Sequence, residues 1–424
     1  IDQAAFAERL LEGLNEIDWP ESTKEMQRNW IGRSTGVEVQ FDIVGGGRFS
    51  IFTTCIETIY GITFMVLAPD GDLVQELMPR IQNQEEVKAY IQETVSKSEM
   101  DRTELNKGKT GCRLEGIKAI NPVNGREVEV FIGDLVLANC GTGAVRAVPS
   151  HDQRADEYAI AHNIDRIQVI EGQDVSEHAF EKQDYLGKGC KLINSEEFTG
   201  LTVEEAKVAI TKKLVDMGIA KETVNYRFRE WIFARQRYWG EPVPIVHLED
   251  GTDYVLPDEE LPLILPELED YKGHNGKAPL ENATEWKQYN KNGVKGVRET
   301  STMPGSAGSS WYYLRYIDPH NDKQLADPEL IKHWMPVDLY VGGPEHAVGH
   351  LMYSRIWNNY LYDKGIVACK EPFKKLVHQG MILGENGIKM GKRFPEYVVN
   401  PSDIVKKYGA DTLRLYEMFM GPLE

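Results

Sequence analysis

The sequence predicts an α/β protein in which an α+β domain precedes a parallel sheet. From residue 301 onward, strands alternate with helices, as they do in parallel α/β sheets. From residue 37 to 219, short β-rich runs are mixed with helical segments, which is typical of an α+β domain. We therefore expect a connector at 1–36, an α+β domain at 37–219, called the inserted domain below, and a sheet-forming region at 220–424 with a loop-rich excursion at about 250–300.

The composition excludes several classes of protein. The length suffices for roughly two to four domains. No apolar run approaches the ~20 residues of a membrane span, and the charged N-terminal stretch differs from a signal peptide, so we expect a cytoplasmic protein with no membrane partner. The scattered cysteines favour neither a zinc site nor a disulfide framework. The net charge of −18 opposes nonspecific nucleic-acid binding, so any RNA contact must use local basic patches.

The first region is expected to hold a helix followed by QRNWIGRSTG, a glycine-punctuated stretch that resembles a linker. Within the inserted domain, we expect strands at VEVQFDIV, RFSIFTT, ITFMVLAP and EVEVFIGDLVLA. Helices are expected at EEVKAYIQETVSKS and VEEAKVAITKKLVDMG.

The stretch GTGAVRAVPSHDQRADEYA resembles the edge of a reaction pocket. Residues 144–148 are expected to form a buried strand, and Ser150 with Gln153 matches a capping box that starts a helix near His151. Asp152 then lies in the first turn, where the helix N-terminus favours a negative charge.

Two residues depart from this pattern. Arg146 interrupts an otherwise apolar strand, and Ala155 lies one turn after Asp152, where a second carboxylate would converge with the first. Three interpretations follow from the residues alone: a working hydrolytic site, a damaged one, or only a capped helix.

The stretch RFREWIFARQRYWG places guanidinium groups beside aromatic rings, a combination that suits phosphate contact and base stacking in RNA. The alternative is an aromatic core helix with a charged outer face. The arginines are Arg227, Arg229, Arg235 and Arg237, and the aromatic residues are Trp231, Phe233, Tyr238 and Trp239.

The most informative α/β signal is an expected buried strand, Val337–Val341, that leads into Gly342 and Gly343 and then into a helix opening near Glu345. A strand, a glycine turn and a helix N-terminus together present backbone N–H groups to a ligand. A nucleotide is the natural candidate for that ligand.

His346 and His350 are four residues apart and are expected to share a helix face. A metal site must be considered, but no third ligand accompanies the pair, so polar contacts to a substrate are favoured over metal. Packing of both histidines against the sheet is the structural alternative.

The stretch ENGIKMGKRFPEYVVNP contains a basic loop. Gly387 and Gly391 free its backbone, while Lys389, Lys392 and Arg393 concentrate positive charge. Such a loop can close on phosphates during phosphoryl or nucleotidyl transfer, although most short basic loops are solvated turns.

Together, these segments resemble the class I leucyl-tRNA synthetases of the bacterial type. The resemblance is collinear through MQRNWIGRS, TELNKGKTG, GTGAV-AVPSHDQR, RQRYWGEPVPI, SSWYYLRYIDP, YVGGPEHAVGHL, QGMI, KMGKR and YGADTLRLYEMF. It implies that the last region is the second half of a Rossmann-like nucleotide-binding sheet and that the inserted domain is an editing domain, which hydrolyses mischarged tRNA. The implied partners are leucine, ATP with substrate-bound Mg²⁺, and a leucine-accepting tRNA, with no protein-bound metal.

The resemblance also implies the roles of individual residues. The resemblance implies that Lys389 and Lys392 bind the ATP phosphates and take part in catalysis, with Gly391 in place of the family's serine. The implied adenosine contacts are Gly342, Gly343, Glu345, Gln379 and Met381; the leucine contacts are Tyr312, Tyr340, His346 and His350; and the editing residues are Thr53, Thr54, Thr58 and Asp152. Within the stretch RFREWIFARQRYWG, we expect Arg235, Arg237 and Trp239 to contact tRNA.

The sequence departs from the family at the editing site. The usual Thr-Thr-Arg-Pro-Asp-Thr motif reads Thr-Thr-Cys-Ile-Glu-Thr from Thr53 to Thr58. Ala155 occupies the position of the aspartate that anchors the aminoacyl ammonium, and Arg146 that of a small or apolar residue. Asp156 cannot substitute easily, because the next residue on a helix points about 100° away. We therefore expect an editing domain in fold whose hydrolysis is impaired.

Other departures concern the catalytic half. The His-Ile-Gly-His signature is absent, and the chain stops at MFMGPLE, where a helical bundle would begin, so we expect the first catalytic half to come from a separate chain or a missing segment. Ser306 stands where relatives commonly place a large aromatic residue of the amino-acid pocket. The alternatives to a leucine–tRNA ligase segment are a tRNA-binding module and a degenerate synthetase-like paralogue without ligase activity.

Overall fold

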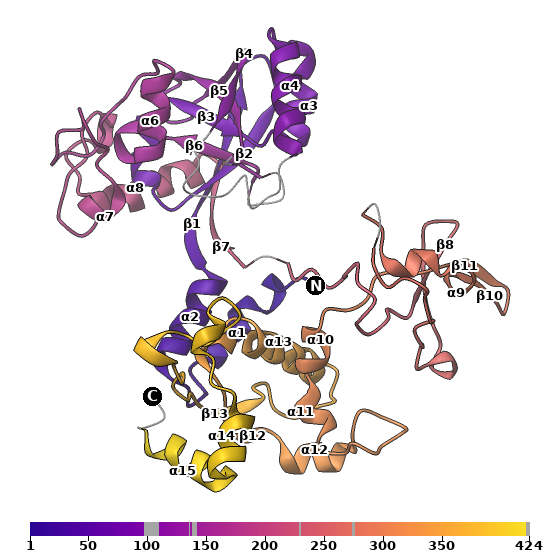
Figure 1. Cartoon of the computed structure of the whole chain (residues 1–424). Helices are drawn as coiled ribbons and strands as arrows, with labels where there is room; N and C mark the ends of the chain where they lie inside the picture. Colours follow the sequence, from indigo (N-terminus) through magenta and orange to yellow (C-terminus); the bar gives the residue numbers. More distant parts are fainter. Residues whose placement is uncertain (97–109, 135, 138–141, 229, 274–275, 421–424) are drawn as a thin grey trace. The chain divides into compact units, whose positions relative to one another are not determined.

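The computed structural model divides into two compact units (Figure 1). The inserted unit is Ser34–Asn225, and the flanking unit combines Ile1–Arg33 with Tyr226–Glu424. Cys140, Arg229 and most of TELNKGKTG lie outside the described residues. The structure describes residues 1–96, 110–134, 136–137, 142–228, 230–273 and 276–420. No helix within these ranges is both long enough and apolar enough to cross a membrane.

The inserted unit is built on a seven-stranded sheet in the order β2-β1-β4-β5-β3-β6, with β7 beside β1 (Figure 1). β3 and β5 pair in parallel, whereas β1 pairs antiparallel with β2 and β4. Each of the four runs expected to be strands contains one. The strands are β1 (Arg33–Ile43), β2 (Arg48–Thr53), β3 (Phe64–Leu67), β4 (Gly111–Ile120), β5 (Glu127–Gly133), β6 (Ala144–Ala147) and β7 (Ala220–Tyr226).

Helices cover this sheet, and the two that the sequence predicts, α4 and α8, are both present. α8 begins with a reciprocal capping box, because the Thr202 hydroxyl accepts from the Glu205 N–H while the Glu205 carboxylate accepts from the Thr202 N–H. Its buried side chains, including Ile210 and Leu214, join the main core of the unit. The helices are α3 (Asp72–Leu77), α4 (Gln84–Val95), α6 (Gln153–Ala161), α7 (Lys182–Tyr185) and α8 (Val203–Asp216).

The stretch QRNWIGRSTG, interpreted above as a linker, is regular structure instead. Its first residues belong to α2 (Glu21–Ile31), and β1 starts at Arg33. Gly32 lies between them with φ of 58°, and its N–H bonds to the Arg28 carbonyl. A left-handed residue of this kind ends a helix at low cost only when it is glycine, so Gly32 turns the chain directly from helix into strand.

The flanking unit contains the parallel pairing that the sequence predicts. β12 (Val337–Val341) pairs in parallel with β13 (Phe373–Val377), in the register Val337 to Phe373. The helices of this unit are α1 (Ala7–Gly13), α2, α9 (Thr284–Lys287), α10 (Ser306–Ser309), α11 (Tyr312–Arg315), α12 (Pro328–Trp334), α13 (His350–Asp363), α14 (Pro401–Tyr408) and α15 (Ala410–Phe419).

A buried ion pair joins α13 to the N-terminal helices. The Arg355 guanidinium, which is fully buried, donates to both carboxylate oxygens of Glu371 at 2.6 and 2.7 Å. It also donates to Gln27 Oε1 of α2 and to the Leu10 carbonyl of α1. Because each of the three guanidinium nitrogens donates to an acceptor, the buried charge is stabilised, and residues far apart in the sequence are held together.

Two expectations about the nucleotide-binding segment are wrong. The strand Val337–Val341 is half exposed, with Leu339 54% exposed, because β12 and β13 form a two-stranded sheet in the described part of the chain. No α-helix opens at Glu345: Pro344–His346 forms a 3₁₀ turn and α13 starts at His350. The intervening Gly349, with ψ of −94°, departs from helical geometry and separates the two segments.

The excursion is also more ordered than the sequence suggests. It contains a four-stranded antiparallel sheet in the order β10-β11-β8-β9, formed around the buried residues Val246, Leu256 and Tyr289. The preceding stretch RFREWIFARQRYWG is irregular rather than an aromatic core helix. The strands are β8 (Ile245–Leu248), β9 (Asp253–Val255), β10 (Gln288–Lys291) and β11 (Val294–Arg298).

Candidate functional sites

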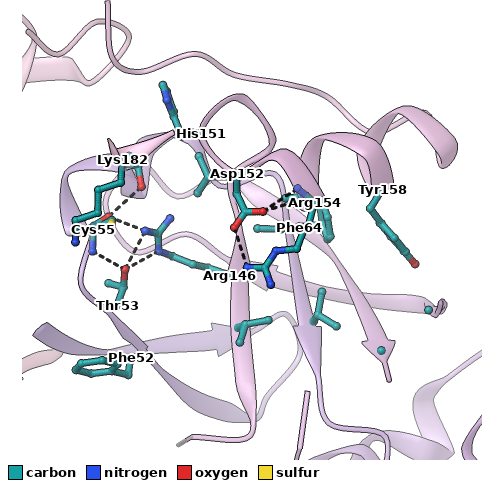
Figure 2. Close-up of a pocket in the computed structure, with 18 of the residues that line it drawn as sticks. Phe52, Thr53, Cys55, Phe64, Arg146, His151, Asp152, Arg154, Tyr158 and Lys182 are labelled. Carbon is teal, nitrogen blue, oxygen red and sulfur yellow. Dashed lines mark hydrogen bonds and ion pairs between the residues drawn. The ribbon is translucent and has the colours of Figure 1, made fainter. Parts of the chain in front are cut away.

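A cavity of about 460 Å³ in the inserted unit brings together the four residues assigned above to editing (Figure 2). Thr53, at the end of β2, and Thr54 and Thr58, in the loop and 3₁₀ turn that follow, line it together with Asp152 at the start of α6; this segment from Thr53 to Thr58 is called the threonine loop. The cavity is also lined by apolar and aromatic side chains, which are Phe52, Phe64, Val66, Ile132, Val145, Val148, Ala155 and Tyr158. The sequence placed the polar half of this cavity but not its aromatic wall.

The start of α6 differs from the capping box expected for Ser150 and Gln153. Asp152 is the N-cap, and its Oδ1 accepts from the N–H groups of Arg154 and Ala155 at 3.0 and 3.1 Å. Ser150 Oγ is buried without a hydrogen-bond partner among the described residues, and Gln153 Oε1 accepts from the Ala179 N–H. The extended backbone of Asp152, at φ −145° and ψ 115°, places its carboxylate over the helix end, which excludes the earlier start.

Asp152 is the one carboxylate among the described residues that line the cavity. Besides its two capping bonds, its Oδ2 lies 3.5 Å from an Arg154 nitrogen, so its negative charge is already partly compensated. The neighbouring Asp156 is fully buried and pairs with Arg166 at 2.5 Å. Asp152 and Asp156 each contact an arginine, whereas residue 155 is an alanine and carries no carboxylate.

Arg146 reaches from β6 to the threonine loop. Its Nε and Nη2 donate to Thr53 Oγ1 at 3.1 and 2.9 Å, and Nη2 also donates to the Cys55 carbonyl at 2.6 Å (Figure 2). Lys182 Nζ lies 3.4 Å from Thr54 Oγ1 on the same side. Two positive side chains therefore hold the loop whose hydroxyl groups the family resemblance assigns to editing.

His151 is held as a neutral imidazole. The Phe180 carbonyl can only accept, so Nδ1 donates to it at 2.9 Å, and Nε2 accepts from the Val169 N–H at 3.0 Å. Burial, together with the nearby Arg146 charge, lowers its pKa from 6.5 to about 4. Because both ring nitrogens are used by the backbone, His151 cannot serve as a general base and instead fixes the chain beside the cavity.

We expect the inserted unit to lose stability as the pH falls from 6.5 towards 4. Over this range the unfolded His151 binds a proton that the folded imidazole does not, so the stabilisation is complete above pH 6.5 and is lost below it, up to about 3 kcal/mol. Denaturant unfolding of the chain at several pH values measures this loss. The His151→Gln variant should lose less stability over the range, and the exposed control His178→Gln should behave as the unmodified chain; equal losses in all three would contradict the assignment.

In the flanking unit, three of the four residues assigned to leucine form one hydrogen-bonded chain. The hydroxyl groups of Tyr312 and Tyr340 are 2.7 Å apart, and the Tyr340 hydroxyl lies 2.6 Å from His350 Nε2. Burial raises the pKa of Tyr340 and lowers that of His350, so both are neutral near pH 7. The His346 ring is 6.3 Å from that of His350 but lies on the 3₁₀ turn, not on a shared helix face.

His378 is a residue that the sequence reasoning missed. Its ring contacts the Gly342 carbonyl through Nδ1 at 2.7 Å and Thr23 Oγ1 through Nε2 at 2.5 Å, so it links the turn after β12 to α2. The signal available in the sequence was its position just before Gln379, within the motif QGMI that supports the resemblance.

Most of the remaining assigned residues are exposed, although Gly343 is buried. Within the described residues, the side chains of Lys389 and Lys392 form no hydrogen bond or ion pair, and Met381 is 50% exposed. Trp239 is 78% exposed and stacks on Tyr271, whereas Arg235 donates to backbone carbonyls of its own segment. Gly343, Glu345, Gln379 and Arg237 have no bond to the tyrosine–histidine chain in the described part of the protein. Nor is there, in that part, a group of three or more His, Cys, Asp or Glu side chains placed to hold a metal ion.

Comparisons with known proteins agree with both units. Residues 28–215 match the family model described as leucyl-tRNA synthetase, editing domain, and residues 201–422 match the model described as tRNA synthetases class I (I, L, M and V). A crystal structure of a ternary complex of Agrobacterium radiobacter LeuRS, tRNA and LeuAMS is 31% identical to this chain, with a TM-score of 0.84. The match covers 100% of this chain and 49% of that one, so the chain spans about half the length of this relative.

Proposed function

This chain belongs to the class I tRNA synthetases of the I, L, M and V group, and from that premise we propose that it is part of a leucine–tRNA ligase. The proposed substrates are leucine, ATP with its Mg²⁺, and a leucine-accepting tRNA. The observation that supports leucine most is the match of the inserted unit to the leucyl-tRNA synthetase editing domain.

The proposed reaction is acyl transfer in two steps. The leucine carboxylate attacks the α-phosphorus of ATP and releases pyrophosphate, and the terminal ribose hydroxyl of tRNA then attacks the adenylate and releases AMP. Catalysis of this kind depends mainly on positioning and on stabilisation of developing charge. In our proposal the charge is stabilised by Lys389 and Lys392, whose exposed side chains are available to phosphates.

The amino-acid site is proposed at the hydrogen-bonded chain of Tyr312, Tyr340 and His350. Tyr340 stacks on the buried Phe373 with ring centroids 3.8 Å apart, and this packing fixes the position of the hydrogen-bonded side chains. A neutral His350 offers a polar contact without repelling the leucine ammonium. ATP is proposed beside it, at the turn formed by Gly342, Gly343 and Glu345, with Gln379 and Met381 in the loop that follows β13.

For the inserted unit we propose an editing domain whose hydrolysis is impaired. An apolar pocket separates side chains that differ by one methylene by only about 1–3 kcal/mol, so such ligases use a second, hydrolytic site. Here Ala155 supplies no carboxylate, and the Thr53 hydroxyl already accepts hydrogen bonds from the Arg146 guanidinium. These features favour, as the second candidate, a synthetase-like module that docks tRNA through Arg235, Arg237 and Trp239 without ligase activity.

Leucine-dependent exchange of pyrophosphate into ATP tests the ligase proposal. In the full-length protein that contains this chain, we expect exchange with leucine to exceed exchange with isoleucine or valine by about tenfold or more, since each extra or misplaced methyl group costs about 1–3 kcal/mol in a fitted pocket. Exchange with none of the three amino acids would favour the module without ligase activity. Faster exchange with isoleucine would contradict the assignment of leucine.

A further inference from the structure

We propose that the cavity of the inserted unit binds a small organic anion: a carboxylate or phosphate monoester carried on an apolar or aromatic body. This inference goes beyond the ligase function and does not depend on it, because it rests on the charges and walls of the cavity alone.

The cavity has an excess of positive charge. Among the described residues, three cationic side chains, Arg146, Arg154 and Lys182, line it against the single carboxylate of Asp152. The Asp152 carboxylate accepts hydrogen bonds from the α6 N-terminus and contacts the Arg154 guanidinium. His151, which also lines the cavity, is neutral at pH 7. The balance is the reverse of what an aminoacyl ammonium requires.

Within the described ranges, no carboxylate pairs with Arg146 or Lys182. The hydrogen bonds of the Arg146 guanidinium go to a hydroxyl and a carbonyl, and that of the Lys182 ammonium goes to a hydroxyl. Both side chains are half buried, where water screens charge less well than at the surface. An anion that enters the cavity would therefore supply the partner that the protein does not.

The apolar lining of the cavity explains why the ligand should be organic rather than a bare ion. Phe64 and Tyr158 stack with ring centroids 5.4 Å apart, and Val66 and Ala155 pack in the same apolar cluster. A cavity of about 460 Å³ falls within the range of roughly 300–1,000 Å³ that small-molecule pockets occupy. The geometry suits a ligand whose oxygen atoms face Arg146 and Lys182 while its body covers the aromatic wall (Figure 2).

Isothermal titration of the 424-residue chain with ligands of matched shape tests the proposal. The probes are 4-methylpentanoate (anionic), 4-methylpentanamide (neutral) and isopentylamine (cationic), with phenyl phosphate and inorganic phosphate as a second series. We expect the two organic anions to bind about tenfold or more tightly than the amide and the amine, because charge-assisted hydrogen bonds contribute about 1.5–3 kcal/mol. Phenyl phosphate should also bind more tightly than inorganic phosphate. Benzoate, which carries a carboxylate on the ring of phenyl phosphate, is compared with phenyl phosphate to identify the anionic group.

Variants locate the binding at this cavity. Arg146→Met and Lys182→Met should each weaken anion binding about tenfold or more, whereas Arg146→Lys, which keeps the charge, should weaken it less. The control is Lys212→Gln on α8, which removes an exposed charge away from the cavity and should leave the affinity unchanged. Circular dichroism melting of each variant verifies that it is folded.

Binding of the amine as tightly as 4-methylpentanoate would overturn the proposal, as would binding of no probe by the unmodified chain. Unchanged anion affinity in both folded Arg146→Met and Lys182→Met variants would also overturn it. None of these outcomes bears on amino-acid activation, because the titrations use neither ATP nor tRNA.

Discussion

Replacement of Lys392 by alanine is expected to lower leucine-dependent pyrophosphate exchange about 100-fold or more in the full-length protein. Removal of one preorganised charge that stabilises a transition state typically costs 10²–10³ in rate. Lys392 is exposed and forms no hydrogen bond or ion pair with the described residues, so its loss should not disturb the fold. The effect should therefore be seen in the rate of exchange and not in stability.

A matched control separates this role from a general effect of charge. Lys406 lies on α14, is exposed, and has no assigned role, so Lys406→Ala should change the exchange rate by less than about twofold. If Lys392→Ala exchanges at the rate of Lys406→Ala, the lysine loop does not take part in the reaction and the ligase proposal loses its catalytic residues.

Introduction of a carboxylate by Ala155→Asp is expected to raise the rate at which the chain deacylates norvalyl-tRNA by about tenfold or more. A charge left without a partner in a partly buried site costs several kcal/mol, and an aspartate on the cavity wall restores that partner to the aminoacyl ammonium. Addition of Arg146→Met should raise the rate further, since it removes a like charge and frees the Thr53 hydroxyl. The two substitutions act on one bound cation, so their effects should not be additive.

The control for this gain is Ile160→Asp on the same helix. Ile160 is 59% exposed and does not line the cavity, so the substitution adds an equal charge without serving the substrate. A gain in Ile160→Asp as large as that in Ala155→Asp would mean that net charge, and not an ion pair in the cavity, controls deacylation.

The sequence predicts the strands and long helices of the inserted unit because their patterns are locally consistent. β1 alternates buried and exposed residues, and α8 carries its own capping box. The start of α6 could not be predicted from the pattern alone. Ser150 and Asp152 are both good N-caps, and the extended backbone of Asp152 decides between them. That backbone conformation depends on the turn before it and on the tertiary contacts of His151.

Parts of the candidate site also depend on tertiary structure. Motifs in the sequence single out Thr53, Asp152 and the alanine at residue 155, where the family has an aspartate. Lys182, by contrast, lines the cavity from α7, and no motif connects α7 to the threonine loop. Nor does the sequence indicate that the Arg146 guanidinium reaches Thr53, because the side chain crosses from one strand to another. In the flanking unit, Tyr312, Tyr340 and His350 meet only because three separate elements pack together.

In our proposal, the charge of the cavity controls hydrolysis in the inserted unit, and deacylation of norvalyl-tRNA by the unmodified 424-residue chain measures its effect most directly. With Arg146 in place and no carboxylate at residue 155, we predict a rate close to that of spontaneous hydrolysis in buffer. Rapid deacylation by the unmodified chain would contradict this account, because it would show that another group, such as Asp152, already holds the aminoacyl ammonium.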